Sequence, residues 1–290
     1  MTSHLIKTGW VSRIGLGAEV RPPAGTQAAG ALSGEFENGA YTPVSPLKSK
    51  IPGANCHEFY TDTTAGCITL AGLMLGLAGR DDNGRPILWV RQNCLSAETG
   101  WPWPAGVAEF GSNPAQIIFV PARDMPSALQ AGLEGARCPT LGAVLIETWG
   151  EAKSYDLTAS RRLALAAKAS GTLVLIARIA AMPRPSAAET RWLVCSVPSR
   201  GLAVNAPGHP AFELTLLRAR NGQDGLHYLV EWDRDTREFV IRSVIGNTEP
   251  AFESALRESG FPSLSGAVVP LPFDRTGTAP DAFSRQRQAG

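Results

Sequence analysis

The sequence lacks the features that mark secreted, membrane-bound and metal-binding proteins. Its five cysteines are odd in number and scattered, and no pair has the spacing of metal ligands. The longest apolar run, residues 173–182, is short for a bilayer span and contains Arg178. The first nine residues do not combine a charged start with an apolar core, as a secretory signal would. These absences predict a cytoplasmic protein with no membrane segment and no bound metal.

Extreme composition is absent as well. The 290 residues are 44% hydrophobic and 18% charged, with a net charge of +1, which excludes a fully disordered chain. The charges are unevenly spread, because residues 151–220 contain ten Lys or Arg against four Asp or Glu. A basic stretch of this kind favours an anionic partner if its charges share one face. Scattered solubilising charge is the alternative that the sequence leaves open.

The ends of the chain differ from its middle. Residues 1–53 are rich in turn-forming and small residues without a period, and they are interpreted as a poorly ordered leader. Residues 247–290 are interpreted as a proline-rich, largely disordered tail with one short helix over 250–258. The core domain is predicted to span residues 54–246.

Within this core, short apolar runs alternate with helical patterns. The runs are apolar throughout instead of alternating, which is typical of a parallel sheet covered on both faces. The sequence therefore predicts an α/β fold: a mostly parallel sheet flanked by helices on both faces, with a C-terminal antiparallel hairpin. The predicted strands are 56–60, 86–90, 115–120, 142–147, 172–176 and 191–195; the helices are 66–79, 125–137 and 156–170; the hairpin joins 212–220 to 226–232; and 96–110 is irregular.

The first strand and helix are joined in the manner of a phosphate-binding loop, which reads Gly-x4-Gly-Lys-Ser/Thr when functional. Here Thr61 replaces the first glycine, Cys67 replaces the lysine and Ile68 replaces the hydroxyl residue, whereas Gly66 is retained. Asp62 adds a negative charge where phosphates would lie. The residues by themselves favour a strand–turn–helix without a ligand. The degenerate loop comprises Thr61, Asp62, Thr63, Thr64, Ala65, Gly66, Cys67 and Ile68.

Several segments resemble the bacterial recombinase RecA. Residues 58–70 resemble its phosphate loop, and residues 143–147 resemble its Walker B strand, with Glu147 in place of the magnesium-binding aspartate. Residues 88–92 lie where that family has a strand ending in the catalytic glutamate, and Gln92 stands there instead. Residues 156–176 resemble the helix and strand before the second DNA-binding loop. The resemblance implies a RecA-like fold.

More specifically, residues 56–233 resemble the ImuA family of RecA-like accessory proteins. The most specific motifs are Asp156-Leu-Thr-Ala-Ser-Arg-Arg-Leu163 and Ser186-Ala-Ala-x-Thr-Arg-Trp192. This resemblance implies a non-catalytic role, without a cofactor, in SOS-induced translesion synthesis and mutagenesis. It also implies contacts with ImuB and RecA and, indirectly, with an error-prone replicative-type polymerase.

With this resemblance, the basic residues of the middle segment become candidates for binding a partner or the DNA backbone. Without it, a solvated helix face is the simpler interpretation of Arg161 and Lys168, which are seven residues apart and share a face. The candidates are Arg161, Arg162, Lys168, Arg178, Arg184, Arg191, Arg218 and Arg220. Two other functions stay open: a residual DNA-dependent ATPase that uses Glu147, and a cell-division inhibitor of the SulA type.

Three further positions carry expectations. His57 is interpreted as a structural residue because strand alternation points it and Glu58 to opposite faces, so neither side chain can orient the other. Cys67, at a helix N-terminus, is either a thiol of lowered pKa or, more commonly, a small buried residue. Trp101 and Trp103, each followed by proline, are either an anchor for a partner or part of the core.

Overall fold

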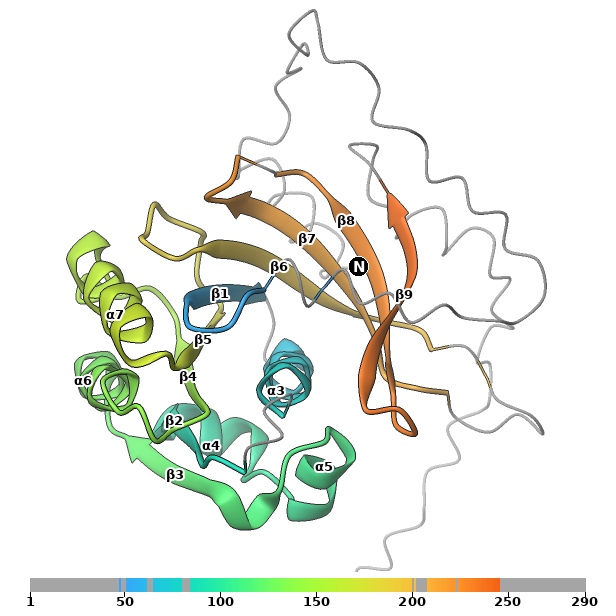
Figure 1. Cartoon of the computed structure of the whole chain (residues 1–290), viewed down its shortest axis with the longest axis horizontal. Helices are drawn as coiled ribbons and strands as arrows, with labels where there is room; N and C mark the ends of the chain where they lie inside the picture. The colour runs from blue at the N-terminus through green and yellow to red at the C-terminus, as the bar shows by residue number, and fades with distance from the viewer. Residues whose placement is uncertain are drawn as a thin grey trace, which may run out of the picture. The chain divides into compact units, whose positions relative to one another are not determined.

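A single sheet organises the part of the chain that the structure describes. The computed structural model describes residues 47, 51–61, 65–79, 84–199, 201, 208–222 and 224–245. Nine strands in these ranges form the sheet, in the order β3-β2-β4-β5-β1-β6-β7-β8-β9 (Figure 1). Their bounds are β1 Cys56–Thr61, β2 Ile87–Gln92, β3 Ile117–Ala122, β4 Ala143–Trp149, β5 Leu173–Ile179, β6 Thr190–Val197, β7 Ala211–Ala219, β8 His227–Asp233 and β9 Glu238–Ile245.

The first six strands in chain order run parallel, and the last three alternate in direction. All pairs from β3 to β6 across the sheet are parallel, whereas β6–β7, β7–β8 and β8–β9 are antiparallel. The predicted α/β class, with its mostly parallel sheet, is confirmed, and so is the hairpin of β7 and β8. The sequence missed β9, which extends the antiparallel part by a third strand.

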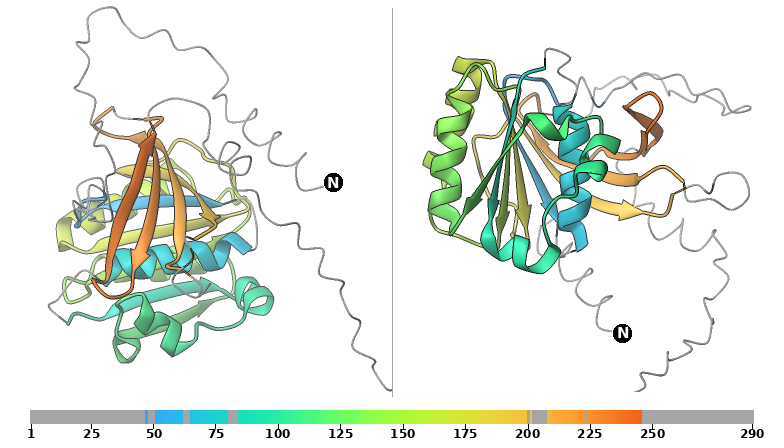
Figure 2. Two further views of the ribbon diagram at one scale, coloured as in Figure 1. Left: turned by 90° about the vertical axis from the view of Figure 1, so that its right-hand side faces the viewer. Right: turned by 90° about the horizontal axis from the view of Figure 1, so that it is seen from below.

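Helices cover both faces of the parallel strands. Figures 1 and 2 show α6 (Met125–Ala136) and α7 (Leu157–Ser170) on one face and α3 (Ala65–Ala78) on the other. Successive residues of β4 divide between two cores: Leu145 packs with α3, whereas Val144 and Ile146 pack with α6 and α7. This double burial explains why the central strands are apolar throughout.

The helix α7 begins and ends where its sequence indicates. The Asp156 carboxylate accepts a hydrogen bond from the Ala159 amide at 2.7 Å and so caps the N-terminus. Gly171 closes the C-terminus in the left-handed conformation, with φ of 77°. Leu163 and Ala167 turn toward the sheet and are buried. Both ends of this helix are therefore set by local sequence.

Two predictions about organisation are wrong. The segment 96–110 is not irregular but contains most of α4 (Asn93–Thr99) and all of α5 (Pro104–Glu109), which lie on the α3 side (Figure 1). Leu47 and Ile51, assigned to the leader, are buried in the same core as α3, so the boundary at residue 53 is too late for them. The predicted helix at 250–258 and the rest of the tail lie outside the described residues.

Candidate functional site

The predicted phosphate loop falls where β1 leads into α3. Thr61 ends β1 and is buried, and Ala65 is the first residue of α3, while Asp62, Thr63 and Thr64 lie outside the described residues. A Cβ on Gly66 would lie 2.8 Å from the Cβ of Thr61, so the side chain at position 61 requires glycine at 66. The retained glycine thus has a packing role that needs no phosphate.

A buried ion pair lies beside this junction, at the carboxyl ends of β2 and β4. Arg91 and Glu147 are register partners on these parallel strands, and Arg91 Nε lies 2.9 Å from Glu147 Oε2. Arg91 is 4% exposed and Glu147 is fully buried. In open α/β sheets, ligands bind outside the carboxyl ends of the strands. Here that edge holds an internal arginine and carboxylate, both shielded from solvent.

The two terminal nitrogens of the Arg91 guanidinium donate hydrogen bonds to three neighbouring groups. Nη1 donates to the Gly100 carbonyl at 3.1 Å, and Nη2 donates to the hydroxyl of Thr99 and to Cys67 Sγ, the latter at 3.4 Å. Cys67 is the residue in the place of the phosphate-loop lysine. Arg91 therefore connects Cys67 with Glu147, and both of its terminal nitrogens donate to groups inside the protein.

Burial shifts the pKa of both groups that face Arg91. Desolvation raises the pKa of Glu147 to about 7, and the Arg91 charge and the nearby Trp89 indole limit that rise. Desolvation and the Glu147 charge raise the pKa of the Cys67 thiol, against the effect of Arg91. Cys67 is thus a buried, protonated thiol at neutral pH, and the alternative of a lowered pKa is wrong.

Gln92, which the sequence analysis compared with a catalytic glutamate, also has an internal partner. Gln92 is buried at the end of β2, and its Oε1 accepts a hydrogen bond from the Trp149 amide at 2.6 Å. This side chain joins the ends of β2 and β4, and it offers no carboxylate to activate water.

A second buried cluster lies on the opposite face of the sheet, beside α7. Glu58 accepts hydrogen bonds from the hydroxyls of Tyr60, at 2.7 Å, and Tyr155. The guanidinium of Arg178 lies 4.5 Å from the centre of the Tyr155 ring and donates to the Gly150 carbonyl at 3.4 Å. Burial and the Glu58 charge raise the pKa of Tyr60 above its ordinary value.

Arg178 is therefore a core residue. It is 3% exposed and lies within β5, so the prediction that it binds DNA or a partner is wrong. The physical reason is that parallel strands are buried on both faces, and an arginine among them must find internal partners.

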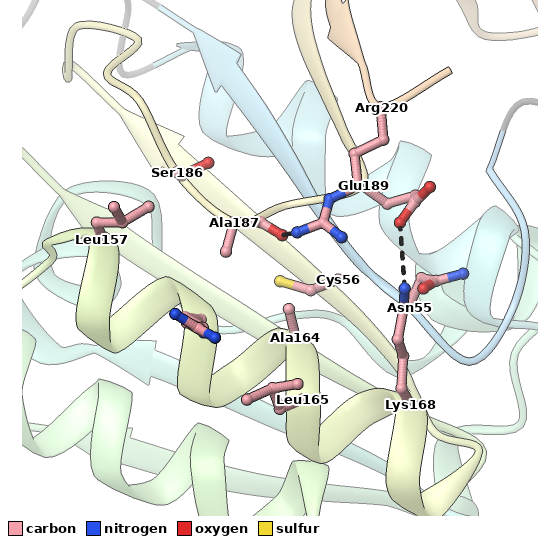
Figure 3. A pocket seen from close by; sticks show the side chains of 11 residues that line it. Asn55, Cys56, Leu157, Ala164, Leu165, Lys168, Ser186, Ala187, Glu189 and Arg220 are labelled. Atoms are coloured by element: carbon pink, nitrogen blue, oxygen red, sulfur yellow. Dashed lines mark hydrogen bonds and ion pairs between the residues drawn. The ribbon is translucent and has the colours of Figure 1, made fainter.

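Three of the other candidates meet in one groove. Arg161 and Lys168 lie on α7, and Arg220 follows β7; together they line a pocket of about 370 Å³ (Figure 3). Lys168 Nζ lies 3.7 Å from Glu189 Oε2, and Arg220 Nη2 donates to the Ala187 carbonyl at 3.3 Å. The whole lining is Asn55, Cys56, Leu157, Arg161, Ala164, Leu165, Lys168, Ser186, Ala187, Glu189 and Arg220.

The other candidate cations lie outside that lining. Arg162 is exposed on α7. Arg191 and Arg218 are register partners across β6 and β7, and Arg218 is exposed. Arg191 donates to the Arg184 carbonyl at 2.7 Å, and Arg184 Nη2 lies 3.3 Å from Glu151 Oε2. The structure thus divides the eight candidates into a groove, separate surface positions and one core residue.

Sequence reasoning missed the roles of Arg91, Glu58 and Tyr155. The sequence did contain one sign of the buried ion pair: an arginine inside the apolar run of β2, because a charge in such a strand needs an internal counter-charge.

His57 is buried, with its ring nitrogens 2.7 Å from Thr190 Oγ1 and 2.9 Å from the Pro52 carbonyl, as a structural residue would be.

Trp101 and Trp103 are exposed instead of lying in the core. The Trp101 ring lies 4.8 Å from that of Phe119.

The five cysteines are free thiols. Among the described residues, no group of three or more His, Cys, Asp or Glu could hold a metal ion. No helix in those ranges is long and apolar enough to cross a bilayer. Comparison with protein-family models gives no match, and no curated protein matches the chain significantly.

Proposed function

We propose that this chain is a non-catalytic, RecA-like accessory protein of DNA-damage-induced translesion synthesis and mutagenesis. In this proposal it acts in the cytoplasm through contacts with ImuB and RecA, and indirectly with an error-prone replicative-type polymerase. The family assignment rests on the sequence motifs, and the mostly parallel α/β sheet is compatible with it.

The observation that carries the non-catalytic part is the buried pair of Arg91 and Glu147. A nucleotide site needs a free ammonium or guanidinium for the phosphates and an accessible carboxylate near magnesium. Here the carboxylate is fully buried against Arg91, and the residue in the lysine position is a thiol that accepts from the same arginine. Because these groups are not accessible to a nucleotide, we infer that the protein acts by recognising other macromolecules.

The groove of Arg161, Lys168 and Arg220 supports recognition as the function. Cations from α7 and from the end of β7 converge there, although they are far apart in the sequence. Contact with a protein is proposed first, and contact with the DNA backbone is the alternative outcome of the test.

The test is co-purification of the tagged protein with ImuB and with RecA, each at low and high salt. The proposal expects a complex with ImuB that survives high salt, because a protein interface also buries apolar surface. Retention of neither protein at low salt contradicts it. Filamentous growth of cells that express the chain, without a complex with ImuB, would instead support a division inhibitor.

A further inference from the structure

The exposed face of α7 carries leucines beside its cations. Leu157 is 57% exposed and Leu165 is 58% exposed. Residues 157, 161 and 165 are four apart, so they lie above one another on the helix, and Lys168 continues the same stripe. One wall of the groove therefore has an arginine between two exposed leucines over about 12 Å of helix, and Lys168 extends this stripe to about 16 Å.

The opposite wall is held in place by hydrogen bonds to the core of the fold. The Ala187 amide donates to Ser160 Oγ on α7 at 3.1 Å, and the Glu189 amide donates to the Cys56 carbonyl at 2.8 Å. The amide of Arg220 donates to the Glu189 carbonyl at 3.0 Å. Because these contacts tie residues 187–189 to α7, β1 and the end of β7, the groove exists before any ligand binds.

The groove combines excess positive charge with apolar lining. The lining contains three cations, Arg161, Lys168 and Arg220, and a single carboxylate, Glu189. Glu189 Oε2 lies 3.7 Å from Lys168 Nζ (Figure 3). Within the described ranges, Arg161 has no hydrogen-bond or ion-pair partner in the protein. A phosphate backbone would use the cations but would leave both leucines uncovered. An acidic peptide with apolar side chains would use all of these features.

We propose that this groove binds a short amphipathic segment of a partner protein, in which an acidic residue lies between two apolar residues. The acidic side chain pairs with Arg161, and the apolar side chains cover Leu157 and Leu165. The inference rests on the proposed function only in taking a protein as the partner.

The first test selects ligands without assuming a sequence. Phage that display random 12-residue peptides are panned on the immobilised full-length protein and counter-selected on the Arg161→Glu variant. The proposal expects enriched sequences with an Asp or Glu flanked by apolar residues three or four positions away. Enrichment of basic sequences, or of none above background, would overturn it.

The second test measures one enriched peptide, labelled with fluorescein, by anisotropy. Arg161→Glu is expected to weaken binding about tenfold or more, and Leu165→Ser severalfold. The matched control is Arg162→Glu, because this neighbour is also exposed but lies outside the groove, and its affinity should stay within about twofold of wild type. A peptide whose acidic residue is replaced by Lys should bind Arg161→Glu better than wild type. Circular dichroism checks that the variants are folded.

The outcomes of these tests distinguish a failure of the groove from a failure of the proposed function. Equal losses in Arg161→Glu and Arg162→Glu would reject the groove, as would a labelled thymidine oligonucleotide that binds through Arg161 while no peptide does. A complex with ImuB that is unaffected by Arg161→Glu would keep the function and reject the groove. A peptide consensus without any complex with ImuB or RecA would keep the groove and reject the function.

Discussion

At the scale of single residues, the pair of Arg91 and Glu147 decides what the strand ends can do. Removing two charges from water is expensive, and their attraction offsets this cost only when both are present. The 2.9 Å separation shows that the pair is formed, while full burial keeps the pKa of Glu147 near 7. Both groups are shielded from solvent, and we propose that the pair closes the site.

Loss of one partner should therefore cost more than loss of both. We expect Arg91→Leu to lower the free energy of unfolding by about 3 kcal/mol at pH 8, because it leaves a buried carboxylate without a counter-charge. The double variant Arg91→Leu/Glu147→Leu should lose less than the single one. Urea unfolding of the two single variants, Arg91→Leu and Glu147→Leu, and of the double variant measures these losses. A loss in the double variant equal to the sum of the two single losses would show that the residues are not coupled.

Glu147 should also make stability depend on pH. Its pKa is raised in the folded protein, so the folded chain holds a proton that the unfolded chain releases above about pH 4.5. The contribution to stability is thus fully present below that pH and is lost as the pH rises through about 7. We expect the difference in stability between pH 5 and pH 8 to shrink in Glu147→Gln, by at most about 3 kcal/mol.

Urea unfolding of wild type and Glu147→Gln at pH 5, 6.5 and 8 checks this expectation. Groups that both proteins share cancel in the comparison. An identical pH dependence in the two proteins would mean that Glu147 keeps an ordinary pKa.

At the scale of elements, predictions succeeded where local sequence sets the structure. The helix α7 has its cap residues Asp156 and Gly171 in the sequence, and the central strands are apolar throughout because both faces are covered. Predictions failed where packing decides. The helix α5 begins at a proline and has little periodicity, and β9 exists through its pairing with β8.

The close packing of α3 under the antiparallel strands gives a prediction at this scale. A Cβ at Gly76 would lie 2.8 Å from ring atoms of both Trp232 and Phe239. We expect Gly76→Val to cost about 1–3 kcal/mol, because two rings must move. The control is Gly106→Ala in α5, where a Cβ meets nothing within 4 Å, and it should be neutral or stabilising by up to about 1 kcal/mol. Thermal unfolding followed by calorimetry measures both, and equal shifts would contradict the packing argument.

At the scale of the whole molecule, the sequence revealed the excess of positive charge but not its distribution in space. Residues 151–220 hold ten cations. Three of the predicted ones converge on a groove through contacts between α7, the segment before β6 and the end of β7, which no local pattern shows. Arg178 has the same residue type but faces the core, because strand position decides its exposure. Tertiary structure alone separates these cases.

The central claim is that the edge where a nucleotide would bind is closed by the protein's own Arg91 and Glu147. Isothermal titration calorimetry of the full-length protein with ATP and magnesium tests it directly. The account predicts no heat of binding at nucleotide concentrations up to the millimolar range. Stoichiometric, magnesium-dependent binding with a micromolar dissociation constant would contradict it.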